Sequence, residues 1–98
     1  MSAGAWTFLS NYGHVLVCLA RDPDVRMRDV SVAVGITERA VQQIVSELVA
    51  QGYVEKEKVG RRNRYRVVRS AHFRHHLESA VSLGSFVDLV AGARGPAD

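Results

Sequence analysis

Apolar side chains in the first half of the chain recur every three or four residues, the pattern of helices with one buried face. The first such stretch runs from Trp6 to Ala20, where we expect a helix. Asp22-Pro23-Asp24 ends it, because proline cannot continue a helix and restricts the residue before it. The next residues, Val25-Arg26-Met27, are predicted to form a very short extended piece. The apolar positions of the first helix are Phe8, Leu9, Tyr12, Val15, Leu16 and Leu19.

Two more helices are predicted around Gly35, which suits the left-handed backbone that ends a helix. The earlier one begins at Arg28 or Asp29 and ends at Val34. The later one runs to about Gln51, with Thr37 as its N-cap and the acid Glu38 at the positive end of the helix dipole. The residues expected to face inward are Val30, Ala33 and Val34 in the earlier helix and Val41, Ile44, Val45 and Leu48 in the later one.

A β-hairpin is predicted next, because Tyr53 to Val59 and Arg64 to Val68 alternate in the manner of strands around a turn with Gly60 and Asn63. In the second strand, Tyr65 and Val67 face away from the flanking arginines. Ser82 is the expected cap of a last helix through Ala91, whose apolar face is Leu83, Phe86, Val87 and Val90.

Helix, extended piece, helix, tight turn, helix and hairpin is the order of a winged helix-turn-helix domain. The predicted fold class is therefore α+β and mainly α, with a three-helix core, a β-hairpin wing and a C-terminal helix. We expect the domain to span residues 1–69. Residues 70–92 are predicted to be a C-terminal segment and helix that dimerise, and residues 93–98 a loose tail.

Composition fits one small domain: 98 residues, 47% of them hydrophobic, with a net charge of +3. Much of the positive charge falls in one short stretch, which indicates either a polyanion-binding surface or an ordinary solvated one. The lone cysteine, Cys18, excludes an internal disulfide and suits a cytoplasmic protein; we expect it, like Trp6, to serve in packing. The basic residues of the stretch are Lys56, Lys58, Arg61, Arg62, Arg64, Arg66 and Arg69.

Other chemistry has little support in the sequence. The uncharged start lacks the basic region of a signal peptide, and polar residues interrupt it too often for a membrane span. No phosphate-binding loop, zinc-helix motif or nucleophile elbow is present, so we predict no enzyme and no cofactor. His72, His75 and His76 could share a face, but no acid or cysteine completes an obvious metal set, and no metal site is predicted.

Residues from about Asn11 to Val68 resemble the winged-helix regulators of the MarR and ArsR type. The resemblance rests on three motifs: Val34-Gly35-Ile36-Thr37-Glu38-Arg39-Ala40-Val41-Gln42, Gly52-Tyr53-Val54 and Gly60-Arg61-Arg62-Asn63-Arg64-Tyr65. Ser31 stands where those proteins often have alanine, and His76 where they tend to have proline. The resemblance implies sequence-specific binding of double-stranded DNA, transcriptional control and a homodimer.

In such a domain the third helix enters the major groove and the wing lies on the backbone or in the minor groove. The candidate DNA-binding residues are therefore Thr37, Glu38, Arg39, Gln42, Gln43 and Ser46 on the helix, and Arg61, Arg62, Asn63 and Arg64 on the wing.

The alternative is a winged-helix module that docks a protein partner through the same helix. Glu38 and Glu47 favour it, because carboxylates repel phosphate, whereas Arg61 and Arg62 at the wing tip argue against it. RNA binding is a third option.

Overall fold

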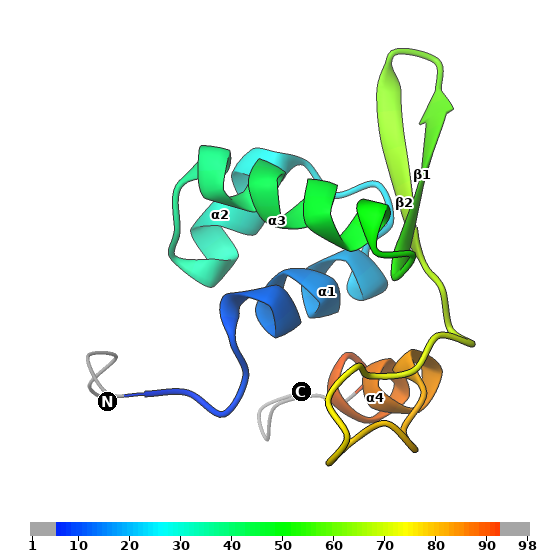
Figure 1. Ribbon diagram of the computed structural model, residues 1–98. Coiled ribbons are helices and arrows are strands. Elements are labelled where there is room, and N and C mark those ends of the chain that lie inside the picture. The colour runs from blue at the N-terminus through cyan, green and yellow to red at the C-terminus, as the bar shows by residue number, and fades with distance from the viewer. Residues whose placement is uncertain (1–5, 93–98) are drawn as a thin grey trace.

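The computed structural model describes residues 6–92. Within them the chain has four helices and one two-stranded antiparallel hairpin, a mainly helical α+β winged helix (Figure 1). The fold class predicted from the sequence is confirmed. The elements are α1 (Asn11–Arg21), α2 (Met27–Val34), α3 (Glu38–Ala50), β1 (Val54–Val59), β2 (Arg62–Val67) and α4 (Leu83–Val90).

The first helix starts later than predicted. α1 begins at Asn11, after Ser10 in an extended backbone conformation, and residues 6–10 are irregular. Trp6 and Phe8 are 74% and 92% exposed, so neither joins the core. The spacing of Phe8 continues the apolar pattern of α1, but within the described chain no surface buries Phe8 or Trp6.

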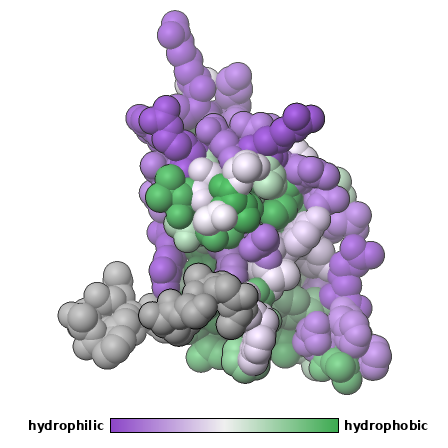
Figure 2. Space-filling view, turned by 90° about the vertical axis from the view of Figure 1, so that its left-hand side faces the viewer, coloured by the Kyte–Doolittle hydropathy of each residue, from purple (hydrophilic) through white to green (hydrophobic). Residues whose placement is uncertain are grey.

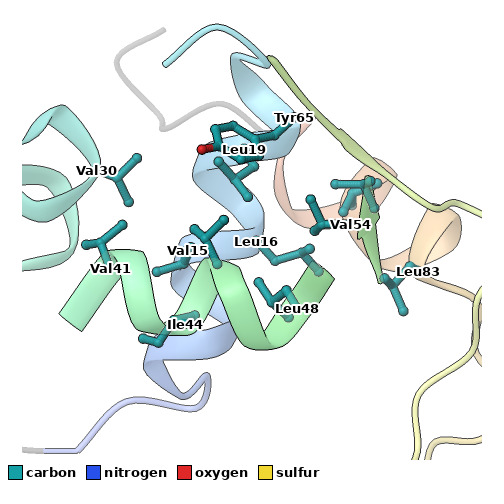
Figure 3. Close-up of a cluster of buried hydrophobic side chains, with 13 residues drawn as sticks. Val15, Leu16, Leu19, Val30, Val41, Ile44, Leu48, Val54, Tyr65 and Leu83 are labelled. Atoms are coloured by element: carbon teal, nitrogen blue, oxygen red, sulfur yellow. The ribbon is translucent and has the colours of Figure 1, made fainter. Parts of the chain in front are cut away.

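The core forms where α1 meets α2, α3 and the base of the hairpin. Val15, Leu16 and Leu19 of α1 are buried among side chains from those three elements (Figure 3). α2 contributes Val30, with Val34 half-buried one turn further along the helix. Ala33 was predicted to face inward but is exposed, because it lies to the side of the helix face that carries these two valines. The other core residues are Val41, Ile44, Val45, Leu48, Val54, Tyr65, Val67, Leu83 and Val87.

The turn between α2 and α3 has the predicted geometry. Gly35 is left-handed, with φ of 86°, and its N–H donates to the Ser31 carbonyl at 2.8 Å. Ile36 packs against the core, and the Thr37 hydroxyl accepts from the Ala40 N–H at 3.0 Å. The left-handed residue and the cap together set the angle at which α3 leaves α2.

The hairpin has a tighter loop than predicted. Val59 pairs with Arg62, so β2 begins two residues before the predicted Arg64 and only Gly60 and Arg61 form the loop. Gly60 is left-handed, with φ of 64°, which matches the first position of a two-residue hairpin turn. The extended piece predicted at Val25-Arg26-Met27 is shorter than expected: Arg26 has an extended backbone, but α2 already starts at Met27 and no strand lies between these two helices.

α4 packs on the core beside the exit from the hairpin. Ser82 caps it, accepting from the Ser85 N–H at 3.1 Å, and Leu83 and Val87 are buried. Gly84 lies so close to Arg69 that an added Cβ would be 3.1 Å from the Arg69 carbonyl oxygen. The tail predicted at 93–98 lies outside the described residues. Across residues 6–92 no helix has the length and apolar character needed to span a bilayer.

Gly35→Ala tests the helix-helix turn. No atom lies within 4 Å of the added Cβ, so any loss comes from the left-handed backbone alone. We expect the free energy of unfolding to fall by about 1–2 kcal/mol in urea titrations. Gly35→Asn should lose less, because asparagine tolerates this conformation better. Equal stability of the alanine variant and the wild type would contradict the role given to the left-handed backbone of Gly35.

Candidate nucleic-acid interface

The side of α3 away from the core is open along its whole length. All six of its predicted contact residues are exposed, and Arg39, Gln43 and Ser46 lie on the side of the helix opposite the buried stripe. Gln42 lies towards one edge of that side. The structure thus brings together one cationic and three neutral polar side chains on a continuous surface. Of the other two, Thr37 uses its hydroxyl as the helix cap, and Glu38 lies at the first turn.

Glu47, at the edge of this surface, is tied to α1. The Tyr12 hydroxyl donates a hydrogen bond to its carboxylate. That bond, with smaller effects of burial and of the negative charge, raises the pKa of Tyr12. Sequence periodicity placed Tyr12 among the apolar positions of the first helix and gave no sign of this contact. The centre of the exposed surface is therefore left to side chains without negative charge.

The hairpin sorts its charges by face. On one face Glu55 is opposite Arg66 and Glu57 is opposite Arg64, and Arg66 donates to Glu55. On the other face Lys56 is opposite Tyr65, with no acid beside either in the pairing. Lys58, opposite Asn63, continues that face towards the tip. The lysines were not among the predicted site residues, although the alternation of the strand would have placed them together.

Two of the four predicted wing residues turn back onto the domain. Arg64 donates through Nε to Asp24 Oδ1 at 2.9 Å and through Nη2 to Oδ2 at 3.4 Å, while Arg62 Nη2 donates to the Asp24 carbonyl at 2.8 Å. The Arg64 guanidinium lowers the pKa of Asp24, and the Asp24 carboxylate raises that of Arg64. Arg61 and Asn63 are exposed, and within residues 6–92 the Arg61 side chain has no hydrogen bond or ion pair.

The remaining candidate groups do not form a chemical centre. His75 and His76 stack on each other, and the His75 ring is 3.8 Å from Glu78, but residues 6–92 contain no group of three or more metal-ligating side chains. Cys18 is half-buried against the core, as predicted, and burial raises the pKa of its thiol.

Comparison with known proteins agrees with this arrangement. A model of the MarR family matches residues 9–64, which run from just before α1 into β2 and include the whole of α3. No curated protein gives a significant match. Because the matched region covers more than half of the chain and has the winged-helix fold, the protein belongs to the MarR family of DNA-binding transcriptional regulators.

Proposed function

We propose that the protein binds double-stranded DNA sequence-specifically, with α3 in the major groove and the wing on the backbone or in the adjacent minor groove. The observation that carries the proposal is the open face of α3, where Arg39, Gln42 and Gln43 stand clear of the core. Such side chains match base edges: arginine pairs with guanine and glutamine with adenine. Thr37, Glu38 and Ser46 are the remaining proposed contacts on the helix.

The wing is proposed to supply affinity rather than sequence preference. Arg61, Arg62, Asn63 and Arg64 lie at or next to its tip, and the hairpin projects from the helical body (Figure 1). Figure 2 shows that this projecting end is strongly hydrophilic. A cation here that has no partner within residues 6–92, such as Arg61, neutralises phosphate and releases counterions, which makes binding depend on salt. Such contacts position the protein and leave the choice of bases to α3.

Fluorescence anisotropy on a duplex of random sequence, over a series of salt concentrations, tests the proposal. We expect Arg61→Ala to flatten the slope of log affinity against log salt by about 0.9, the loss of one phosphate contact. Arg74→Ala is the matched control, because Arg74 carries the same charge but lies in the segment leading to α4. Absence of wild-type binding even at about 50 mM salt would contradict the proposal.

Sequence readout needs a separate measurement on an operator selected from a random library. Arg39→Ala should reduce the difference in binding free energy between the operator and a random duplex by about 1–3 kcal/mol, because one bidentate base contact is lost. Arg39→Lys should restore only part of it, since lysine cannot pair through a planar fork. An unchanged difference in binding free energy would mean that other residues of the domain read the bases.

A protein-docking module is the second candidate function, and one observation favours it. Val32 on α2 is 77% exposed. Figure 2 shows a hydrophobic patch over the face of the molecule that carries α2. Failure of DNA binding in the salt series would favour this patch and α3 as a docking surface for a protein partner.

We infer that the protein acts as a homodimer in the cytoplasm. A single half-buried cysteine suits that compartment, because thiols stay reduced there. Exposed apolar side chains gather on the N-terminal segment and around α4, away from the wing (Figure 1). Leu89 on α4 is 76% exposed, and Trp6 stacks edge-on against Phe8 with ring centroids 4.8 Å apart. A two-fold pairing of α1 and α4 would cover these side chains and let two α3 helices reach half-sites about one DNA turn apart.

Analytical ultracentrifugation at low micromolar concentration tests the dimer. Leu89→Asp should shift the protein towards monomer, because a carboxylate would be buried without a partner in the interface. Val32→Asp, an equal change on α2, should leave the dimer intact. A wild type that sediments as a monomer would contradict the pairing.

A further inference from the structure

The wing is fastened to the loop between α1 and α2 by three contacts. Arg64 holds the Asp24 carboxylate with two hydrogen bonds, and Arg62 holds the carbonyl of the same residue. The third contact is between backbones: the Tyr65 N–H donates to the Pro23 carbonyl at 3.0 Å. Two successive residues of the loop therefore contact side chains and backbone of β2.

The loop presents Asp24 in a fixed position. Pro23 restricts its own backbone, and the Asp22 carboxylate accepts from the Asp24 N–H at 3.0 Å. The Val25 N–H closes the turn on the Asp22 carbonyl, also at 3.0 Å. The Asp24 carboxylate is thus held before the arginines reach it, which lowers the entropy lost when the contacts form.

The same face of the hairpin is close to electrical balance. Arg62, Arg64 and Arg66 lie there with Glu55, Glu57 and the added Asp24. A phosphate that approached Arg64 would meet these carboxylates at short range. The tip residue Arg61 and the opposite face, with its two lysines, have no such opposition in the strand pairing.

We propose that Asp24 is a positioning residue that fixes the wing against the helices and withholds Arg64 and Arg62 from phosphate. Salt-dependent DNA binding is then carried mainly by Arg61, Lys56 and Lys58. An exposed ion pair alone is weak, and the side chains of Arg64 and Asp24 are half-exposed. Here the ion pair acts together with the Arg62 and Tyr65 contacts, which are made to the same loop. The Asp24 carboxylate also stays beside Arg64, where it repels an incoming phosphate. This inference rests on the proposed DNA binding.

The first test compares salt slopes for duplex DNA in two variants that remove the same charge. Asp24→Asn removes the charged partner of Arg64 and should steepen the slope by about 0.9, the gain of one phosphate contact by Arg64. The bond of Arg62 to the backbone carbonyl of residue 24 stays in place. Glu57→Gln is the matched control: Glu57 is opposite Arg64 in the hairpin but has no hydrogen bond to it, and its slope should change much less. Equal changes in both variants would overturn the proposal, because general charge would explain them.

A double-mutant cycle identifies the partner. Arg64→Ala should flatten the slope more in the Asp24→Asn background than in the wild type, because only there is Arg64 free to bind phosphate. Equal losses in the two backgrounds would overturn the withholding role. Thermal unfolding by circular dichroism verifies that each variant is folded.

Hydrogen exchange tests the fastening without DNA. Asp24→Asn should speed exchange of the Tyr65 amide several-fold, and Glu57→Gln should not. Unchanged exchange would overturn the positioning role even if DNA binding is normal. If the wild type fails to bind DNA but Tyr65 responds as expected, the proposed function fails and the fastening of the wing stands.

Discussion

The burial of one stripe of α1 is the constraint on which the rest of the structure depends. Val15, Leu16 and Leu19 lie at the point where α1 packs against α2, α3, β2 and α4. Full burial of such a side chain contributes about 1.5–3 kcal/mol, which is large beside the total stability of a domain of this size. Because α3 and the hairpin both pack against this stripe, the positions of the candidate recognition surface and of the wing depend on the same buried side chains.

The hairpin follows from the same constraint. Its base is buried through Val54, Tyr65 and Val67, whereas its outer half is charged on both faces. A two-stranded ribbon is marginally stable by itself in water, so the outer half depends on the buried base and on side-chain pairs along the strands. The contact of β2 with the Pro23-Asp24 loop adds a third point of support beyond the core. A wing held at base and side can keep one orientation relative to α3.

Features with a local signal were predictable, and features made by distant residues were not. Gly35, Thr37 and Ser82 end or begin helices through backbone geometry that one residue type favours, and the structure confirms all three. The start of α1 was misplaced because apolar spacing reports a possible buried face but not whether a partner surface exists. The open face of α3 follows from its periodicity. Asp24 and Arg64 are 40 residues apart, and an ion pair between exposed side chains leaves no periodic trace.

The placement of the acids favours a polyanionic partner over a protein. Carboxylates near the candidate interface are bound to groups of the chain itself: Glu47 to Tyr12, Glu55 to Arg66 and Asp24 to Arg64. Glu38 lies at the α3 N-terminus, where the helix dipole stabilises its charge. An acid held by an internal partner cannot swing into the groove that α3 would occupy. A protein-docking surface would gain from acids that are free to pair with a partner, and this arrangement withholds most of them. The internal pairs thus clear negative charge from the middle of the surface and leave it at the margins, where it limits the directions from which DNA can approach.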